Sequence, residues 1–190
     1  MNTNITNIIN TVKKFLKPRI ALLVAAALLF ISIFMPLMTP SRELKNEIKD
    51  SIEYAEDMGN DELEDAYKAL LKPSSSKLFS NFAIKAVTEK MFLSETFFYL
   101  GIAAGVPIIF IILIAVFAFF KKYIPVVIFS VLNFIVILVR NSLFNQTVID
   151  SEKFEWAFGN GFMIFAVILV VAATIWNIIE TKKAKAALNA

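Results

Sequence analysis

The 190-residue sequence contains no cysteine and no histidine. The chain therefore has no disulfides, no thiolate metal ligands, no thiol nucleophile and no imidazole for acid–base catalysis. It also lacks a Gly-rich phosphate loop and a Gly-x-Ser-x-Gly turn. Serine–lysine chemistry stays open, although no such pair stands apart from the others. These absences favour a protein that is not an enzyme, and we expect no cofactor and no metal site.

Charge is scarce as well, at 18% of residues against 58% that are hydrophobic. Four apolar runs carry none: Ile20–Met38, Phe97–Phe120, Tyr123–Val139 and Phe162–Ile179. About 20 helical residues cross a hydrocarbon core of about 30 Å. The sequence therefore predicts an all-α integral membrane protein, a bundle of four transmembrane helices in the lipid bilayer. The first run has no small-x-small cleavage pattern, so we expect a retained span and not a signal peptide.

The net charge of +3 is distributed unevenly along the chain. Basic residues gather before Ile20, at Lys121-Lys122 and after Ile179, whereas acidic residues dominate the segment between the first two runs. Short basic segments stay in the cytoplasm. We therefore expect a multi-pass protein of the cell (plasma) membrane with both termini cytoplasmic, and no binding to nucleic acid. The abundance of Ile, Phe, Asn and Lys is typical of a bacterium with an AT-rich genome.

The predicted segments follow from these runs. They are a cytoplasmic amphipathic segment at 1–19, spans at 20–38, 97–120, 123–143 and 161–179, an extracytoplasmic helical cap at 39–96, an outer loop at 144–160 and a cytoplasmic tail at 180–190. In the cap, Thr39 is expected to begin one helix, Gly59 to end it, and Asn60 or Asp61 to begin the next. Neither strand alternation nor an internal repeat is visible.

Small residues predict where helices pack closely. Gly101 and Gly105 form a small-xxx-small face in the second span, and Pro107 is expected to kink that helix. Ala157, Gly159 and Gly161 form a related pattern near the outer end of the fourth span, where we expect it to pack close to a neighbour. These residues favour packing within the chain. Self-association through Gly101 and Gly105, giving a homo-oligomer, is a second hypothesis.

The third span carries a polar face. Ser130, Asn133 and Arg140 are spaced to lie on one side of a helix, with Asn133 near mid-bilayer and Arg140 near the outer boundary. We expect Asn133 to seek a partner across the bundle, and Arg140 to snorkel or to pair with Glu95 or Glu155. The face is either an interfacial anchor with one structural hydrogen bond or a contact for a substrate or partner.

The cap carries an acidic cluster of Glu56, Asp57, Asp61, Glu62, Glu64 and Asp65. The cluster does not match a calcium-binding loop, because Gly59 occupies a ligand position and Lys68 stands where a bidentate Glu is needed. A solvated helix face is the expected structure.

The layout of inside termini, a long first outer loop, a tight inner turn and a shorter second outer loop resembles that of claudin-like four-span proteins. Their Trp-Gly-Leu-Trp signature and cysteine pair are absent, so the resemblance concerns topology alone. The function we expect is that of a non-enzymatic interaction or scaffold subunit, whose acidic cap meets a protein partner. One alternative is a small transporter or channel component that uses Pro107 and the polar face. Another is an immunity or resistance protein against a membrane-active peptide.

Overall fold

The computed structural model describes residues 17–84, 95–149 and 153–188, and 84% of it is helical. The predicted amphipathic segment 1–19 lies almost wholly outside these ranges. The described elements are α2 (Pro18–Ser32), β1 (Met38–Pro40), α3 (Arg42–Asp57), α4 (Asp61–Leu71), α5 (Ser75–Phe79), the π-helix η1 (Ser80–Ile84), α7 (Glu95–Phe119), α8 (Tyr123–Phe144), the π-helix η2 (Asn145–Ile149), β2 (Phe154–Trp156) and α9 (Phe158–Leu188).

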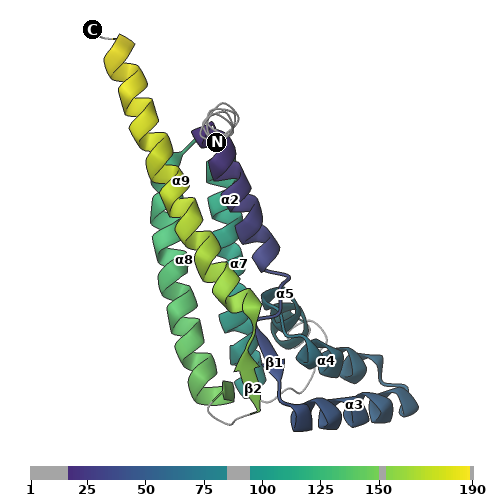
Figure 1. The fold of residues 1–190 in the computed structure, drawn as a ribbon. Coiled ribbons are helices and arrows are strands. Elements are labelled where there is room, and N and C mark those ends of the chain that lie inside the picture. The colour runs from purple at the N-terminus through teal and green to yellow at the C-terminus, as the bar shows by residue number, and fades with distance from the viewer. Residues whose placement is uncertain (1–16, 85–94, 150–152, 189–190) are drawn as a thin grey trace, which may run out of the picture.

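Among the described residues, three helices are long and apolar enough to cross a membrane. They cover Phe98–Phe119, Tyr123–Thr147 and Phe158–Ala184, and correspond to the second, third and fourth predicted runs. A tight turn joins α7 to α8, and its Lys121 adopts a positive φ of 58°. The chain thus reverses direction at once, so the two helices pack as antiparallel neighbours (Figure 1).

The first predicted span differs from expectation. Its helix, α2, has 15 residues and ends at Ser32, so the predicted helix over 20–38 is wrong in its second part. Pro36 has no N–H to continue a helix and disfavours helical geometry in the residue before it. Beyond it, the Leu37 N–H donates to the carbonyl of Pro73 at 2.7 Å. The backbone after α2 therefore bonds to another segment instead of to its own helix.

Four helices form the centre of the molecule: α2 packs against α7 and α9, and α8 packs against the same two (Figure 1). We call α2, α7, α8 and α9 the helix core. Its interior is filled by side chains at most 1% exposed, including Leu22, Leu29, Ile111, Ile114, Val126, Ile137, Met163 and Val170. Its outer surface is also apolar, with Ile109, Val139 and Ile168 more than half exposed. Helices that are apolar all round suit a lipid environment.

The structure is mostly helical, but it has two short strands that the sequence did not predict. β1 and β2 pair antiparallel, with Met38 opposite Trp156 and Pro40 opposite Phe154. Each strand has three residues, too few for alternation to be visible in the sequence. The prediction that Thr39 caps the next helix is also wrong, because this residue lies in β1. The helix that follows is capped by Ser41, whose Oγ accepts from the Leu44 N–H at 3.3 Å.

The next two helices, α3 and α4, form a hairpin that projects sideways from the helix core (Figure 1). Its turn has the expected chemistry. Gly59 adopts a left-handed φ of 64°, and the Asn60 side chain accepts from the Leu63 N–H at 3.1 Å. Both predictions are confirmed. The end of the helix core where this hairpin and the strands lie is called the hairpin end below.

Replacing Gly159 by alanine should destabilise the fold. A Cβ at this position would lie 2.2 Å from the carbonyl oxygen of Pro36, to which the Gly159 N–H donates at 3.0 Å. Because backbone atoms must move, we expect a loss of about 1–3 kcal/mol, seen as a lower thermal midpoint in detergent. Gly161→Ala is the control, since a Cβ there meets nothing within 4 Å. Equal midpoints for the two variants would contradict the packing described.

Candidate functional site

The polar residues of α8 lie on its buried face. Ser130 and Asn133 are 0% exposed, and Arg140 is 1% exposed. Val126 and Ile137 are buried on the same face, as their helical spacing requires. The polar groups therefore point into the helix core, and their partners must come from α7, α9 or α8 itself.

Arg140 is surrounded by neutral acceptors. Its Nη2 donates to Oδ1 of Asn141 at 2.8 Å and to Oδ1 of Asn160, and its Nε donates to the same Asn141 oxygen at 3.2 Å. Its Nη1 lies 3.4 Å from the sulfur of Met163, and the guanidinium carbon lies 6.0 Å from the centre of the Phe144 ring. These contacts orient the guanidinium, but none of the groups carries a negative charge.

The predicted ion pair with Glu155 is absent from the described residues. Glu155 is exposed in β2, opposite Thr39 of β1. Glu95 begins α7, but its side chain lies outside the described part of the chain. Asn160, the amide on α9 that accepts from Arg140, is not among the residues predicted from the sequence. The sequence gives little indication of this role, because a polar residue between two glycines at the start of an apolar run is typical of a helix terminus.

Asn133 and Ser130 have no hydrogen-bond partner among the described residues. Both polar atoms of the Asn133 amide and the Oγ of Ser130 are buried without one, so the partner expected across the bundle is not found. Asn177 behaves differently, because its Nδ2 donates to the carbonyls of Ala173 and Pro18, each at 2.7 Å. An unsatisfied buried polar group costs about 1–3 kcal/mol. The polar face of α8 therefore lowers the stability of the helix core.

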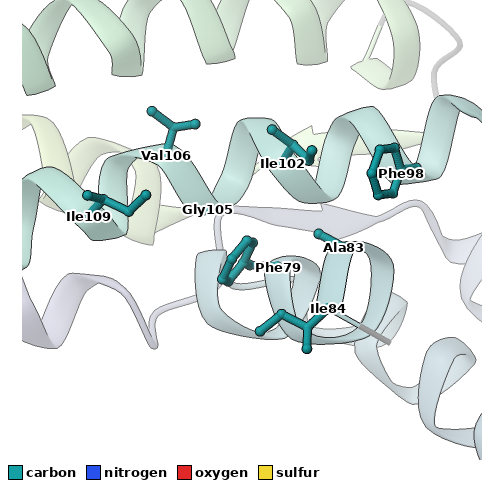
Figure 2. Close-up of a pocket in the computed structure, with 8 residues that line it drawn as sticks. All are labelled: Phe79, Ala83, Ile84, Phe98, Ile102, Gly105, Val106 and Ile109. Atoms are coloured by element: carbon teal, nitrogen blue, oxygen red, sulfur yellow. The ribbon is translucent and has the colours of Figure 1, made fainter. Parts of the chain in front are cut away.

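Gly101 and Gly105 allow α5 and η1 to pack closely on α7. A Cβ at Gly101 would lie 2.8 Å from the backbone carbon of Phe82, and one at Gly105 would lie 2.1 Å from the ring of Phe79. Figure 2 shows the Phe79 ring directly below Gly105. The same chain thus occupies this face of α7. The face that carries these two glycines is therefore not free to bind a second copy of the chain. A homo-oligomer would need another surface.

An apolar groove of about 390 Å³ lies where these segments meet (Figure 2). Phe79 and Ala83 form one wall, and Ile102 and Val106 of α7 form the other. Pro107 is buried within α7, next to this groove in sequence, and the helix continues through it. The groove has no polar side chain in its lining, so it can bury an apolar group but offers no side-chain hydrogen bond.

The small residues at the start of α9 differ in how closely they pack against the rest of the chain. The backbone N–H of Ala157 donates to the carbonyl of Leu37 at 2.9 Å. Gly161 is exposed, and nothing lies within 4 Å of the Cβ it lacks, so the packing predicted there is not found. The close approach occurs at Gly159, against Pro36. The pattern therefore predicted close packing at this helix end, and of its two glycines Gly159 makes the contact.

The acidic cluster lies around the turn of the α3–α4 hairpin. Lys68 crosses it, pairing with Glu64 and, at 3.7 Å, with Glu56. Within the described ranges, no group of three or more His, Cys, Asp or Glu residues is close enough to hold a metal ion. Asp57, Asp61 and Glu62 are exposed. The cluster is therefore a solvated acidic surface in this part of the chain.

Comparisons of this chain with protein-family models, with curated proteins and with solved structures found no match. Its function must therefore be argued from its own geometry. The features that stand out are the buried polar face of α8, the acidic hairpin and the apolar groove along α7.

Replacing Asn133 by leucine should stabilise the protein. The substitution removes two unsatisfied polar atoms from an apolar interior. We expect a gain of about 1–3 kcal/mol, which raises the thermal midpoint in detergent by several degrees. Asn177→Leu is the matched control and should lower the midpoint, because that amide makes two hydrogen bonds. A lower midpoint for Asn133→Leu would mean that this amide has a partner in solution.

Proposed function

We propose that this chain is a four-span protein of a bacterial cell membrane with both termini cytoplasmic. Three described helices have the length for a span, so the proposal depends on α2. The Asn177 side chain bonds to the carbonyl of Pro18, and the Gly159 N–H bonds to that of Pro36. At about 1.5 Å per residue, the part of α9 between these contacts is about 27 Å long, close to the thickness of a hydrocarbon core. α2 and the turn after it therefore match a span in length.

Its function, in this proposal, is that of a non-enzymatic interaction subunit whose extracytoplasmic hairpin binds a protein partner. The observation that carries it is the hairpin tip, which we define as Tyr54, Asp57, Met58, Asp61 and Glu62. Tyr54 and Met58 are 63% and 66% exposed, beside exposed carboxylates. Large apolar side chains beside charges of one sign are typical of a binding surface.

The hairpin is built as a projecting element. α3 packs against α4 and β1, and its buried residues are Ile48 and Ala55 alone. The tip is the part of the hairpin farthest from the helix core (Figure 1). The surface complementary to it is a basic one with an apolar pocket, and the partner should present such a surface outside the membrane.

Cysteine labelling tests the topology, because the chain has no cysteine of its own. Asn46→Cys in α3 should react with a membrane-impermeant maleimide in intact cells. Ala184→Cys in α9 should react only after lysis. Both sites are exposed, so accessibility differs by side of the membrane and not by burial. Labelling of Ala184→Cys in intact cells would refute the orientation.

Native mass spectrometry of the C-terminally tagged chain, purified gently from its host, tests the partner. A stoichiometric second protein is expected. Reversing the charges of Asp57, Asp61 and Glu62 to lysine should remove it, with a loss in affinity of tenfold or more. The control reverses Glu43, Glu47 and Asp50, which are exposed at other positions on α3. Partner loss in both triple variants would point to net charge and not to the tip, and a bare chain from the host would refute the proposal.

A transporter or channel component is the second candidate, and the unpartnered amide of Asn133 favours it. Polar groups inside a membrane bundle mark pathways for ions or polar solutes. Asn133→Cys should then react with small water-soluble thiol reagents, whereas Ile137→Cys, on the same buried face, measures the background. Lack of reaction at both positions would leave the interaction subunit as the better proposal.

A further inference from the structure

A second groove, of about 490 Å³, runs between α7 and α8. It is lined among others by Tyr99, Ala103 and Val106 of α7 and by Val136, Val139 and Arg140 of α8. Farther from the hairpin end, aromatic rings close the same seam: Phe117 stacks on Phe129 at 5.5 Å, and Phe110 lies 6.2 Å from Phe129. The groove is therefore confined to the half of the seam nearer the hairpin end, where the short side chain of Ala103 leaves space.

The lining is apolar along most of its length and has two polar side chains at one end. Tyr99 and Arg140 supply its polar groups near the hairpin end, and the walls toward mid-membrane are aliphatic. Val139 is 56% exposed and Tyr99 is 64% exposed, so the groove opens outward, whereas Arg140, 1% exposed, lies at its buried floor. Its volume is within the range of about 300–1,000 Å³ that small-molecule sites occupy. A ligand that fits both parts has one polar end and an apolar chain.

Arg140 determines the charge of that polar end. Among the described residues, its guanidinium contacts amide oxygens, a thioether sulfur and an aromatic ring, and no carboxylate of these residues pairs with it. A buried charge without a counter-ion costs several kcal/mol. An anionic oxygen would offset that cost, and phosphate matches the guanidinium in geometry.

The depth of Arg140 in the membrane identifies the source of the phosphate. α8 begins at Tyr123. At about 1.5 Å per residue, Arg140 lies about 26 Å from that end, near the far boundary of a hydrocarbon core of about 30 Å. Lipid phosphates lie at this boundary, and basic pockets between transmembrane helices are known to hold lipid headgroups.

We propose that the α7–α8 groove binds one anionic phospholipid, with an acyl chain along Ala103, Val106 and Val136 and the phosphate on Arg140. Nη1 carries two N–H donors, and its contact among the described residues is the Met163 sulfur, so the phosphate accepts from the second donor, while Asn141 and Asn160 keep Nε and Nη2 in place. The site is separate from the hairpin tip, so it stands whether or not the tip binds a partner.

The test measures lipid binding to the delipidated full chain in neutral detergent by native mass spectrometry. The probes are phosphatidylglycerol and phosphatidylcholine with identical acyl chains. Wild-type protein should bind phosphatidylglycerol about tenfold more tightly, as expected for charged hydrogen bonds. Arg140→Gln should abolish this preference. Arg140→Lys should keep part of it, because an ammonium retains the charge without the fixed orientation that Asn141 and Asn160 give the guanidinium.

Filling the groove supplies an independent variant. Ala103→Phe should weaken binding of both lipids by tenfold or more, because the ring occupies the space of the acyl chain. Ala172→Phe is the matched control: Ala172 lines the groove of about 330 Å³ between α8 and α9, which has no cation. That variant should bind phosphatidylglycerol like the wild type. If Arg140→Gln does not fold, Arg140→Lys and Ala103→Phe still decide the question.

Three results would overturn the proposal. Equal affinity of the wild type for the two lipids would remove the role of the charge. Loss of phosphatidylglycerol in Ala172→Phe but not in Ala103→Phe would place the lipid elsewhere. Glycerol 3-phosphate, which has the headgroup phosphate without acyl chains, is the last probe. If it bound as tightly as the lipid and with the same dependence on Arg140, the site would be one for a soluble anion.

Discussion

The backbone junction just after α2 holds the molecule together. Leu37 donates its N–H to Pro73, and the carbonyls of Pro36 and Leu37 accept from Gly159 and Ala157. In an apolar environment every backbone group needs a partner within the protein, so a chain that leaves a helix there must bond to other segments. Here those segments are the start of α9 and the residues before α5. One short stretch thus fixes α2 against α9 and brings the segment between them to the hairpin end.

The other contacts at that end depend on this junction. β1 follows it directly and pairs with β2, and Ser41, at the end of β1, caps α3. Because the chain returns through Pro73, α5 and η1 are placed against α7, where Gly101 and Gly105 provide room for a backbone and a ring. The hairpin is therefore anchored at its base and projects at its turn.

The helix core combines satisfied and unsatisfied polar groups. Asn177 bonds within α9 and to the start of α2, which contributes to their alignment. Asn133 lies at a deeper level with both polar atoms unpaired, and Arg140 has neutral acceptors for a full positive charge. Both lower the stability of the helix core, and natural proteins retain such groups where a function needs them. The two proposals name different partners for these polar groups: an anionic lipid for Arg140 and a polar solute for Asn133.

The sequence alone determined the apolar helices, the tight turn at Lys121, the turn at Gly59 and the shared face of Ser130, Asn133 and Arg140. These depend on hydrophobicity and on spacing within one segment, which a sequence states directly. Only the tertiary structure decided that α2 ends at Ser32, that β1 pairs with β2, that Gly105 packs against Phe79 and that Asn160 accepts from Arg140. Each of these joins residues far apart in the chain. Their physical cause is the need to satisfy backbone groups and fill space across the bundle, and that need has no local signature.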